Sequence, residues 1–345
     1  MNLQELVRPN IWSLKPYSSA RHEFEGQADV FLDANENPYG SVYSRYPDPL
    51  QTELKEKISI YRSIPTGNIF LGNGSDEAID LIIRIFCNPG MDEILILPPT
   101  YGMYKVCADI SDIKVKECLL TPEFQLDLAQ IKNSLTPRTK LLFICTPNNP
   151  TGNLIEPGSI EKVLQVFNGI VVLDEAYIDF AGPGQSWLDK LSRYPNLIIL
   201  QTFSKAWGLA AIRLGLAFAA PEIIDLMNKV KPPYNVNLLT QQAALRSLSE
   251  YEAKKSREIS EINSEKMRLM NLLEAREEVL KVYPSDANFL LVKFSDPHYV
   301  FYHLRNAGII VRDRTNTPLC EGCLRITIGT PKENQLLIET LNSMV

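Results

Sequence analysis

Five short apolar segments alternate with helix-patterned segments through the middle of the chain, and this alternation constrains the fold more than any other feature. The apolar segments cover residues 93–97, 141–145, 170–173, 197–202 and 214–219. They are apolar throughout, as is typical of parallel strands covered by helices on both faces. Helix-patterned stretches lie beside them at 76–86, 126–134 and 160–167. This order predicts an α/β fold with a mostly parallel central sheet and crossover helices.

The remainder of the chain predicts a second, smaller domain, since 345 residues exceed the usual size of one domain. Pro232 and Pro233 interrupt the helical pattern, and a long charged, helix-patterned stretch follows from about residue 238 to 278. Strand-like segments then occur at 289–293, 309–311 and 324–328. The predicted organisation is an N-terminal arm over 1–30 that packs with the small domain, a large domain over 31–245, and a small α+β domain over 246–345. The long helix that starts near 238 joins the two domains.

Charge and composition exclude several classes of function. The net charge is −6 and its acidic and basic residues are interspersed, whereas a nucleic-acid-binding protein needs a basic face. The sequence contains no uncharged apolar run of about 18 residues, so a membrane span is not expected. The first residues lack the apolar core of a signal peptide. Six scattered cysteines suit reduced thiols, so we expect a cytoplasmic protein. Cys320 and Cys323 lack the further ligands of a zinc site, and we expect no metal.

Two charged residues follow predicted strands at the positions where a parallel sheet presents side chains to a ligand. Asp174 closes the 170–173 segment, and Lys205 comes three residues after the 197–202 segment. A carboxylate at such a position can keep a pyridinium nitrogen protonated. A lysine whose pKa is lowered by desolvation can form an imine with an aldehyde. Simpler alternatives are a turn-capping Asp and a surface Lys.

Three further segments add groups that suit a phosphate and an aromatic ring. Arg213 lies among apolar residues and needs a partner, for which a phosphate or a buried carboxylate would serve. Gly74, Ser75 and Asp76 lead into a helix whose free N–H groups attract an anion, although they also suit plain N-capping. Asn149 follows a strand and can bind a ring oxygen, although such turns are common. Each segment is weak alone, but together at strand ends they predict one site.

The motifs around these residues resemble those of the fold-type I pyridoxal-5′-phosphate (PLP) transferases, and among them the histidinol-phosphate aminotransferase family. The similarity extends over nearly the whole chain. The matching segments are Leu14-Lys-Pro-Tyr17, Leu32-Asp-Ala-Asn35-Glu-Asn37, Arg45-Tyr46-Pro-Asp48, Pro99-Thr-Tyr101-Gly-Met-Tyr104, Asp174-Glu-Ala-Tyr177, Ser204-Lys205-Ala, Asp286-Ala-Asn288-Phe and Leu324-Arg325-Ile-Thr. The resemblance implies that the large domain binds PLP and that the protein is a homodimer.

The resemblance also implies a role for each matched residue. Lys205 would form a Schiff base with PLP and move a proton, Asp174 would pair with the pyridine nitrogen, and Tyr177 with Asn149 would bind the ring hydroxyl. The other cofactor contacts would be Tyr101 on the ring, with Gly74, Ser75, Asp76, Thr202, Ser204, Arg213 and a second subunit's Tyr46 around the phosphate. The substrate-binding positions would be Tyr17, Asn35, Arg312 and Arg325.

The activity implied by the resemblance is amino-group transfer from glutamate to imidazole-acetol phosphate, which yields 2-oxoglutarate and histidinol phosphate in histidine biosynthesis. A threonine-phosphate decarboxylase and an aromatic amino-acid aminotransferase share this fold and stay open as alternatives. A non-enzymatic PLP-binding module is a third. An unrelated nucleotide-binding protein is a fourth, but it would need a Gly-x-Gly-x-x-Gly fingerprint or a P-loop, and the chain has neither. The expected partners are these small-molecule substrates and a second copy of the chain.

Overall fold

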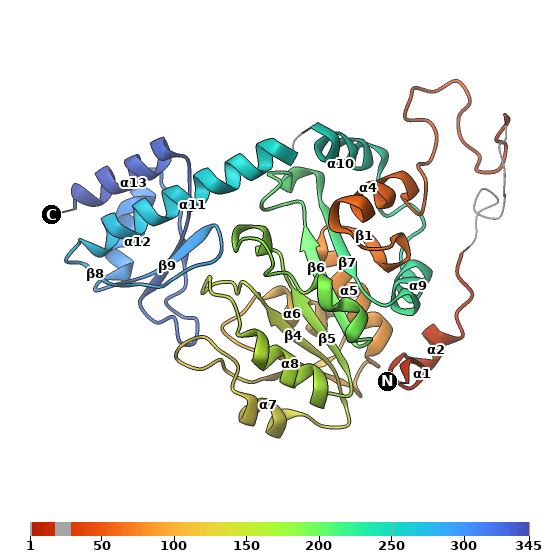
Figure 1. Cartoon of the computed structure of the whole chain (residues 1–345), viewed down its shortest axis with the longest axis horizontal. Coiled ribbons are helices and arrows are strands. Elements are labelled where there is room, and N and C mark those ends of the chain that lie inside the picture. Colours follow the sequence, from red (N-terminus) through yellow and green to blue (C-terminus); the bar gives the residue numbers. More distant parts are fainter. Residues whose placement is uncertain (1, 18–28, 251, 345) are drawn as a thin grey trace.

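The computed structural model describes residues 2–17, 29–250 and 252–344, and it contains two sheets with their covering helices (Figure 1). We call the part built on the seven-stranded sheet the large domain. Its strand order is β1-β7-β6-β5-β4-β2-β3. The strands are β1 (Ile69–Asn73), β2 (Glu93–Ile96), β3 (Lys114–Glu117), β4 (Thr139–Cys145), β5 (Ile170–Asp174), β6 (Leu197–Thr202) and β7 (Leu214–Phe218). The five strands predicted from apolar segments are all present.

The sheet is mostly parallel, as predicted, but one strand runs the other way. β2, β3, β4, β5 and β6 pair in parallel, whereas β7 is antiparallel to both β6 and β1. The expectation of a parallel strand at 214–219 is therefore wrong in direction. Every residue of β7 is buried. A continuous apolar run indicates that a strand is buried on both faces, but it does not indicate whether the strand is parallel or antiparallel to its neighbours.

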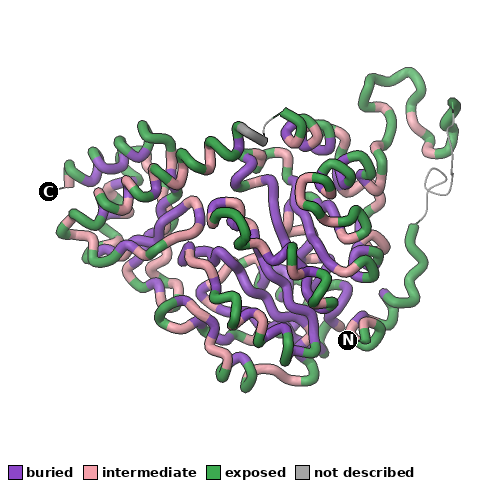
Figure 2. Tube along the Cα trace, in the orientation of Figure 1, coloured by how far each residue is buried: buried purple, intermediate pink, exposed green. Residues whose placement is uncertain are grey.

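Helices cover both faces of this sheet. They are α4 (Thr52–Arg62), α5 (Ser75–Phe86), α6 (Met103–Ile110), α7 (Leu128–Ser134), α8 (Pro157–Val166) and α9 (Pro221–Val230), with 3-10 turns η1 (Thr66–Asn68), η2 (Ile178–Phe180), η3 (Leu188–Arg193) and η4 (Ala210–Ile212). On one face α4, α7 and α8 pack against side chains such as Leu142 and Val171, and on the other α5, α6 and α9 pack against Phe143 and Val172. Consecutive strand residues point to opposite faces. The buried residues accordingly concentrate along the strands (Figure 2).

The small domain is built on a four-stranded antiparallel sheet in the order β10-β11-β9-β8. Its strands are β8 (Val279–Val282), β9 (Phe289–Phe294), β10 (Arg312–Asp313) and β11 (Cys323–Thr327), and its helices are α11 (Glu252–Glu274), α12 (Pro297–Asn306) and α13 (Pro331–Asn342). This confirms an α+β architecture. The strand expected at 309–311 is displaced to β10, because Ile309 and Val311 pack against the apolar core while the ladder with β11 begins at Arg312.

The helical stretch predicted from 238 to 278 is shorter than expected and divided. The structure has α10 (Leu238–Glu250) and α11, which ends at Glu274. In Figure 1, α11 runs from the large domain to the small one. None of the helices in the described ranges is both long and apolar enough to cross a membrane.

The described part of the N-terminal arm packs against the large domain, and not against the small domain as expected. Its helices α1 (Leu3–Leu6) and α2 (Pro9–Trp12) place Val7 and Ile11 in the apolar cluster of α5 and α9. The Arg8 N–H donates to Ile85 O at 3.0 Å, and Lys229 Nζ donates to Trp12 O at 2.8 Å. Figure 1 shows the small domain on the opposite side of the molecule. The rest of the predicted arm, at 18–28, lies outside the described residues.

One hydrophobic cluster spans both domains, and the small domain also has a cluster of its own. Leu291 of β9 and Cys323 of β11 belong to the same buried cluster as Leu142 and Leu173 of the large sheet. Hydrogen bonds cross the same boundary, because the Asp286 N–H donates to Gly152 O at 2.7 Å and the Leu154 N–H donates to Asp286 Oδ2 at 2.8 Å. The small domain is therefore packed directly beside the strand ends of the large sheet.

Candidate active site

A cavity lies at the carboxyl ends of β4, β5 and β6. Parallel strands bring the loops that follow them to the same edge of a sheet, which is where ligands bind in folds of this class. The cavity is lined by Ser75, Asp76, Tyr101, Cys145, Asn149, Asp174, Ala176, Tyr177, Thr202, Ser204, Lys205 and Arg213. All of them except Cys145 and Ala176 are residues that the sequence predicts for the cofactor. Segments distant in the chain thus converge as expected.

Asp174, the last residue of β5, is 3% exposed and has two hydrogen-bond donors. The Tyr104 hydroxyl donates to its Oδ2 at 2.6 Å, and the Ala176 N–H donates to its Oδ1 at 3.1 Å. Burial raises the pKa of Asp174, while these two hydrogen bonds act in the opposite direction. The carboxylate is therefore held in one orientation at the strand end.

Tyr104 has no role in the sequence-based prediction, although it ends one of the motif segments. It lies on α6, is completely buried, and stacks on Phe143 of β4 with 4.7 Å between ring centroids. A buried phenol hydroxyl needs a hydrogen-bond partner, and here the partner is Asp174. The one sequence feature that points to Tyr104 is its position on the buried side of an amphipathic helix, and this feature does not by itself indicate a partner.

Lys205 follows β6 in a turn and is solvent-accessible on the side of the cavity. Its Nζ lies 5.4 Å from the centroid of the Tyr177 ring. Desolvation lowers the pKa of Lys205, and the charge of Arg325 lowers it further, whereas Asp174 and Asp76 oppose the change. Arg213 also lowers the pKa of Lys205, but less than Arg325 does.

The start of α5 and the loop before β7 form a corner of the cavity with several groups that can donate to an anion. Ser75 and Asp76 open α5, and Arg213 Nη2 lies 3.4 Å from Asp76 Oδ2. Arg213 Nη1 donates to Ser204 Oγ at 3.5 Å. Gly74 has a φ of 80°, and a Cβ at this position would come within 2.7 Å of Arg213 Nη2. A helix start, hydroxyl groups and a guanidinium are together the donors that bind a phosphate.

Gly215 of β7 is a supporting residue of this corner that the sequence does not reveal. A Cβ on Gly215 would come within 2.0 Å of the Ser75 nitrogen and 2.2 Å of the Gly74 carbonyl carbon. β7 therefore lies directly behind the turn that begins α5. Only a glycine permits this close approach of two backbone segments.

The small domain contributes Arg325 of β11 to the opposite side of the cavity. Arg325 Nη1 donates to Asn149 Oδ1 at 2.5 Å, and its guanidinium lies 5.2 Å from the centroid of the Phe289 ring. Asn149 Nδ2 in turn lies 3.5 Å from the Tyr177 hydroxyl. Burial raises the pKa of Tyr177, so its hydroxyl is a hydrogen-bond donor near neutral pH. The cavity is thus bordered by both domains.

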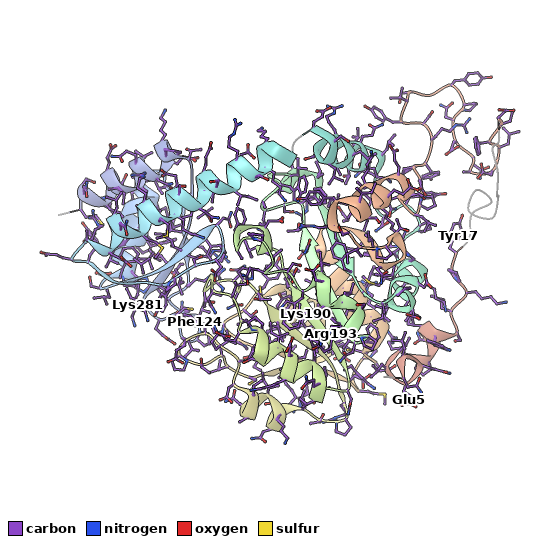
Figure 3. The ribbon with its side chains drawn as sticks, viewed as in Figure 1. Glu5, Tyr17, Phe124, Lys190, Arg193 and Lys281 are labelled. Atoms are coloured by element: carbon purple, nitrogen blue, oxygen red, sulfur yellow. The ribbon has the colours of Figure 1, made fainter. Side chains whose placement is uncertain are left out.

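Six predicted residues are not among those that line this cavity. Gly74 and Arg325 contact lining residues, whereas the other four lie elsewhere. Tyr17 is 74% exposed and lies on the extended segment beyond α2 (Figure 3). Asn35 and Tyr46 line a separate hollow, where Tyr46 stacks on Tyr234 with 4.4 Å between ring centroids. Arg312 is exposed and pairs with Arg325 across the β10–β11 ladder. A single chain therefore does not bring Tyr17, Asn35 or Tyr46 to Lys205.

Glu175 is a second buried carboxyl group, next to Asp174 and without a predicted role. It accepts hydrogen bonds from Ser186 Oγ and the Trp187 N–H at 2.7 Å each, and from Gln201 Nε2 at 2.9 Å. Burial raises the pKa of Glu175 to about 7. Its contacts hold the segment before η3 against β6, behind the cavity wall.

Comparison with known proteins agrees with this geometry. A family model described as aminotransferase class I and II matches residues 24–341. The chain is 52% identical to the histidinol-phosphate aminotransferase of Parabacteroides distasonis, over 99% of both chains. It is 51% identical to that of Christiangramia forsetii, over 99% of this chain and 98% of that one. The solved histidinol-phosphate aminotransferase of Clostridium acetobutylicum superposes with a TM-score of 0.80 at 25% identity, covering 89% of this chain and 96% of the other. The chain therefore belongs to the class I and II aminotransferases, and among them to the histidinol-phosphate aminotransferase family.

Proposed function

We propose that this chain is a PLP-dependent transaminase that interconverts histidinol phosphate plus 2-oxoglutarate and imidazole-acetol phosphate plus glutamate, in histidine biosynthesis. The observation that carries the proposal is the convergence of Lys205, Asp174 and the phosphate-binding corner in one cavity. PLP, when bound, supplies an aldehyde that exchanges with the substrate amine and a protonated ring that accepts electrons. The names of the relatives support the choice of substrates.

The cavity residues fit PLP in both charge and shape. Gly74 leaves the space that a Cβ would fill beside Arg213, so a phosphate can approach the start of α5. Ser75, Asp76, Thr202, Ser204 and Arg213 would surround the phosphate, the partner's Tyr46 would reach it, and Tyr101 would lie against the ring. Asp174 would hold the ring nitrogen in its protonated form, with Tyr177 and Asn149 at the ring hydroxyl. In this proposal 31–245 is the cofactor-binding domain and 246–345 the small domain.

Lys205 would tether the cofactor and then move a proton at its Nζ. Because desolvation and the charge of Arg325 lower the pKa of this amine, its Nζ would be able to accept a proton from the substrate α-carbon and hold it beside the cofactor. Arg325 would bind the anionic group of each substrate through its planar fork. Tyr17, Asn35 and Arg312 remain proposed substrate contacts.

We further propose that the protein is a cytoplasmic homodimer. Residues 30–46 extend away from the large domain (Figure 1) and expose apolar side chains, including Leu32 at 89% and Tyr39 at 95%. Exposed apolar segments of this kind favour an interface with another chain. Tyr46 lies outside the cavity of its own chain, which supports a role in the cavity of a partner. The six buried free thiols suit a reducing compartment.

The proposal is tested by supplying glutamate and imidazole-acetol phosphate to the PLP-loaded protein. We expect 2-oxoglutarate and histidinol phosphate in equal amounts, with matching changes in the cofactor absorbance. Lys205→Ala should lower turnover by roughly 10²-fold or more, because the proton-transferring amine is lost. Lys105→Ala, an exposed lysine on α6, serves as the control and should keep full activity.

Three outcomes would contradict the proposal. Release of carbon dioxide from threonine phosphate would identify a decarboxylase of the same fold. Amino transfer to phenylpyruvate without use of a phosphorylated acceptor would identify an aromatic amino-acid aminotransferase. Binding of PLP without turnover of any amino donor would identify a non-enzymatic module.

A further inference from the structure

Three arginines of the small domain, Arg312, Arg314 and Arg325, lie together on β10, β11 and the residue that follows β10. Arg312 pairs with Arg325 across the β10–β11 ladder, and the Arg314 N–H donates to Cys323 O at 3.0 Å just beyond it. Within the described ranges, no ion pair includes any of the three guanidinium groups. Asp313, which stands between two of them, accepts hydrogen bonds from the Thr315 N–H at 2.8 Å and from Thr315 Oγ1 at 2.7 Å.

This cluster is unfavourable for the folded chain by itself. Burial lowers the pKa of Arg314, and the charges of Arg325 and Arg312 lower it further. The same causes, burial first and then Arg312, lower the pKa of Arg325. The Nε atoms of Arg314 and Arg325 are buried and have no hydrogen-bond partner. Like charges on neighbouring strands repel, and buried donors are normally satisfied, so an anionic ligand would stabilise this arrangement.

Arg314 also lies near Tyr177, which lines the cavity. Its charge lowers the pKa of the Tyr177 phenol, as does that of Arg325, against the larger effect of burial. Arg325 itself reaches the cavity through Asn149. The cluster therefore lies beside Tyr177 and Asn149, two residues that line the cavity, and Arg325 contacts Asn149 directly.

We propose that Arg314 is a substrate-binding residue that selects a doubly charged phosphate at the subsite of Arg312 and Arg325. This inference rests on the proposed transamination, in which one subsite accepts the phosphate of one substrate and the carboxylate of glutamate. Arg325 alone can bind either anion through its planar fork. A third guanidinium adds a further charge-assisted hydrogen bond. This bond stabilises a phosphate with two negative charges more than a carboxylate with one.

The experiment compares the two amino donors in separate half-reactions of the PLP-loaded enzyme, with the variants Arg314→Gln and Arg314→Lys. For Arg314→Gln we expect kcat/KM with histidinol phosphate to fall about 10- to 100-fold, which is the loss of one charge-assisted hydrogen bond. With glutamate the change should stay below about threefold. Arg314→Lys, which keeps the charge and loses the fork, should give an intermediate result.

A binding measurement keeps the test independent of turnover. Inorganic phosphate should inhibit the glutamate half-reaction competitively, and Arg314→Gln should raise its inhibition constant about tenfold. Arg305→Gln, an exposed arginine on α12 of the same domain, is the control for the loss of one positive charge and should change neither value. Thermal unfolding should show that Arg314→Gln folds at least as stably as the wild type, because it removes a repulsive charge.

Equal losses with both donors, or an unchanged inhibition constant for phosphate, would overturn the role of Arg314. The proposed function is judged separately, by whether the wild-type enzyme uses histidinol phosphate. If it does not, the dependence of phosphate inhibition on Arg314 still decides whether the cluster binds a dianion.

Discussion

Two donors oppose the effect of burial on Asp174, and one of them is the Tyr104 hydroxyl. Tyr104→Phe keeps the stacking on Phe143 and removes only this donor. We expect the pKa of Asp174 to rise further, so the acid limb of the profile of kcat/KM against pH should move to higher pH. The free energy of unfolding should fall by about 2 kcal/mol where Asp174 is ionised. This deficit should shrink as the pH falls, because a protonated carboxyl group depends less on the donor.

The control for Tyr104→Phe is Tyr61→Phe, which removes a phenol hydroxyl that accepts from Lys255 Nζ at 2.8 Å outside the cavity. It should leave the acid limb in place. An unchanged acid limb in Tyr104→Phe, measured together with denaturant unfolding at several pH values, would show that Tyr104 only fills space beneath the sheet.

At the scale of single residues, the sequence predicts a place in the cavity well where a charged side chain lies just beyond or within an apolar segment. Lys205, Asp174 and Arg213 are of this kind, and all three line the cavity. Tyr104 and Arg314 are not. Tyrosine is common on the buried side of a helix, and the carboxylate that Tyr104 contacts is 70 positions away. Such a pair depends on the packing of α6 on the sheet, which no local pattern contains.

At the scale of elements, the cofactor corner depends on how closely β7 approaches the start of α5. Gly215→Ala would place a methyl group within 2.0 Å of the Ser75 nitrogen, so the Gly74–Ser75 turn must move. We expect a loss of about 1–3 kcal/mol of stability and a clear weakening of PLP affinity, because the displaced turn carries the proposed phosphate donors. Cofactor titration by absorbance and thermal unfolding measure the two effects.

Gly158→Ala is the matched control for Gly215→Ala. A Cβ at Gly158 meets no atom within 4 Å, and the residue lies in the first turn of α8. Alanine there should be neutral or stabilising by up to about 1 kcal/mol, since glycine is a poor helix former. Unchanged cofactor affinity in Gly215→Ala would mean that the turn can relax without disturbing its donors.

The elements that the sequence predicts are the ones whose local pattern is strong. The central strands are continuous apolar runs, whereas β3 is a polar edge strand with exposed ends, and β1 contains Gly72 and Asn73. Neither of these gives a strand signal by itself. The direction of β7 depends on which strands it joins, and it lies between β6 and β1, which are more than a hundred positions apart. Pairing over such a separation is set by the whole sheet.

At the scale of the whole molecule, the proposed dimer can be tested by mixing two impaired variants, Lys205→Ala and Tyr46→Ala. If each site combines Lys205 of one chain with Tyr46 of the other, a mixed dimer contains one intact site and one doubly impaired site. Random reassociation should then restore about a quarter of the wild-type activity per site. Steady-state transamination after denaturation and refolding of the mixture provides the measurement.

The separate variants, refolded in the same way without mixing, are the controls and should stay impaired. Sedimentation velocity should give the mass of two chains for each variant. If the mixture gains no activity although mixed dimers form, Tyr46 acts within its own chain or not at all.

The core that continues from the large sheet into β9 and β11 has a consequence for how the molecule comes apart. Leu291 and Cys323 pack in the same cluster as Leu142 and Leu173, so neither sheet can lose its structure without exposing side chains of the other. Heat or denaturant should therefore melt both domains in a single cooperative transition. The boundary proposed near residue 245 therefore separates two sheets in the chain topology, but it does not separate two units that unfold independently. A large domain cut free at that point would retain nearly every group that lines the cavity and still lack the wall that keeps those groups in place.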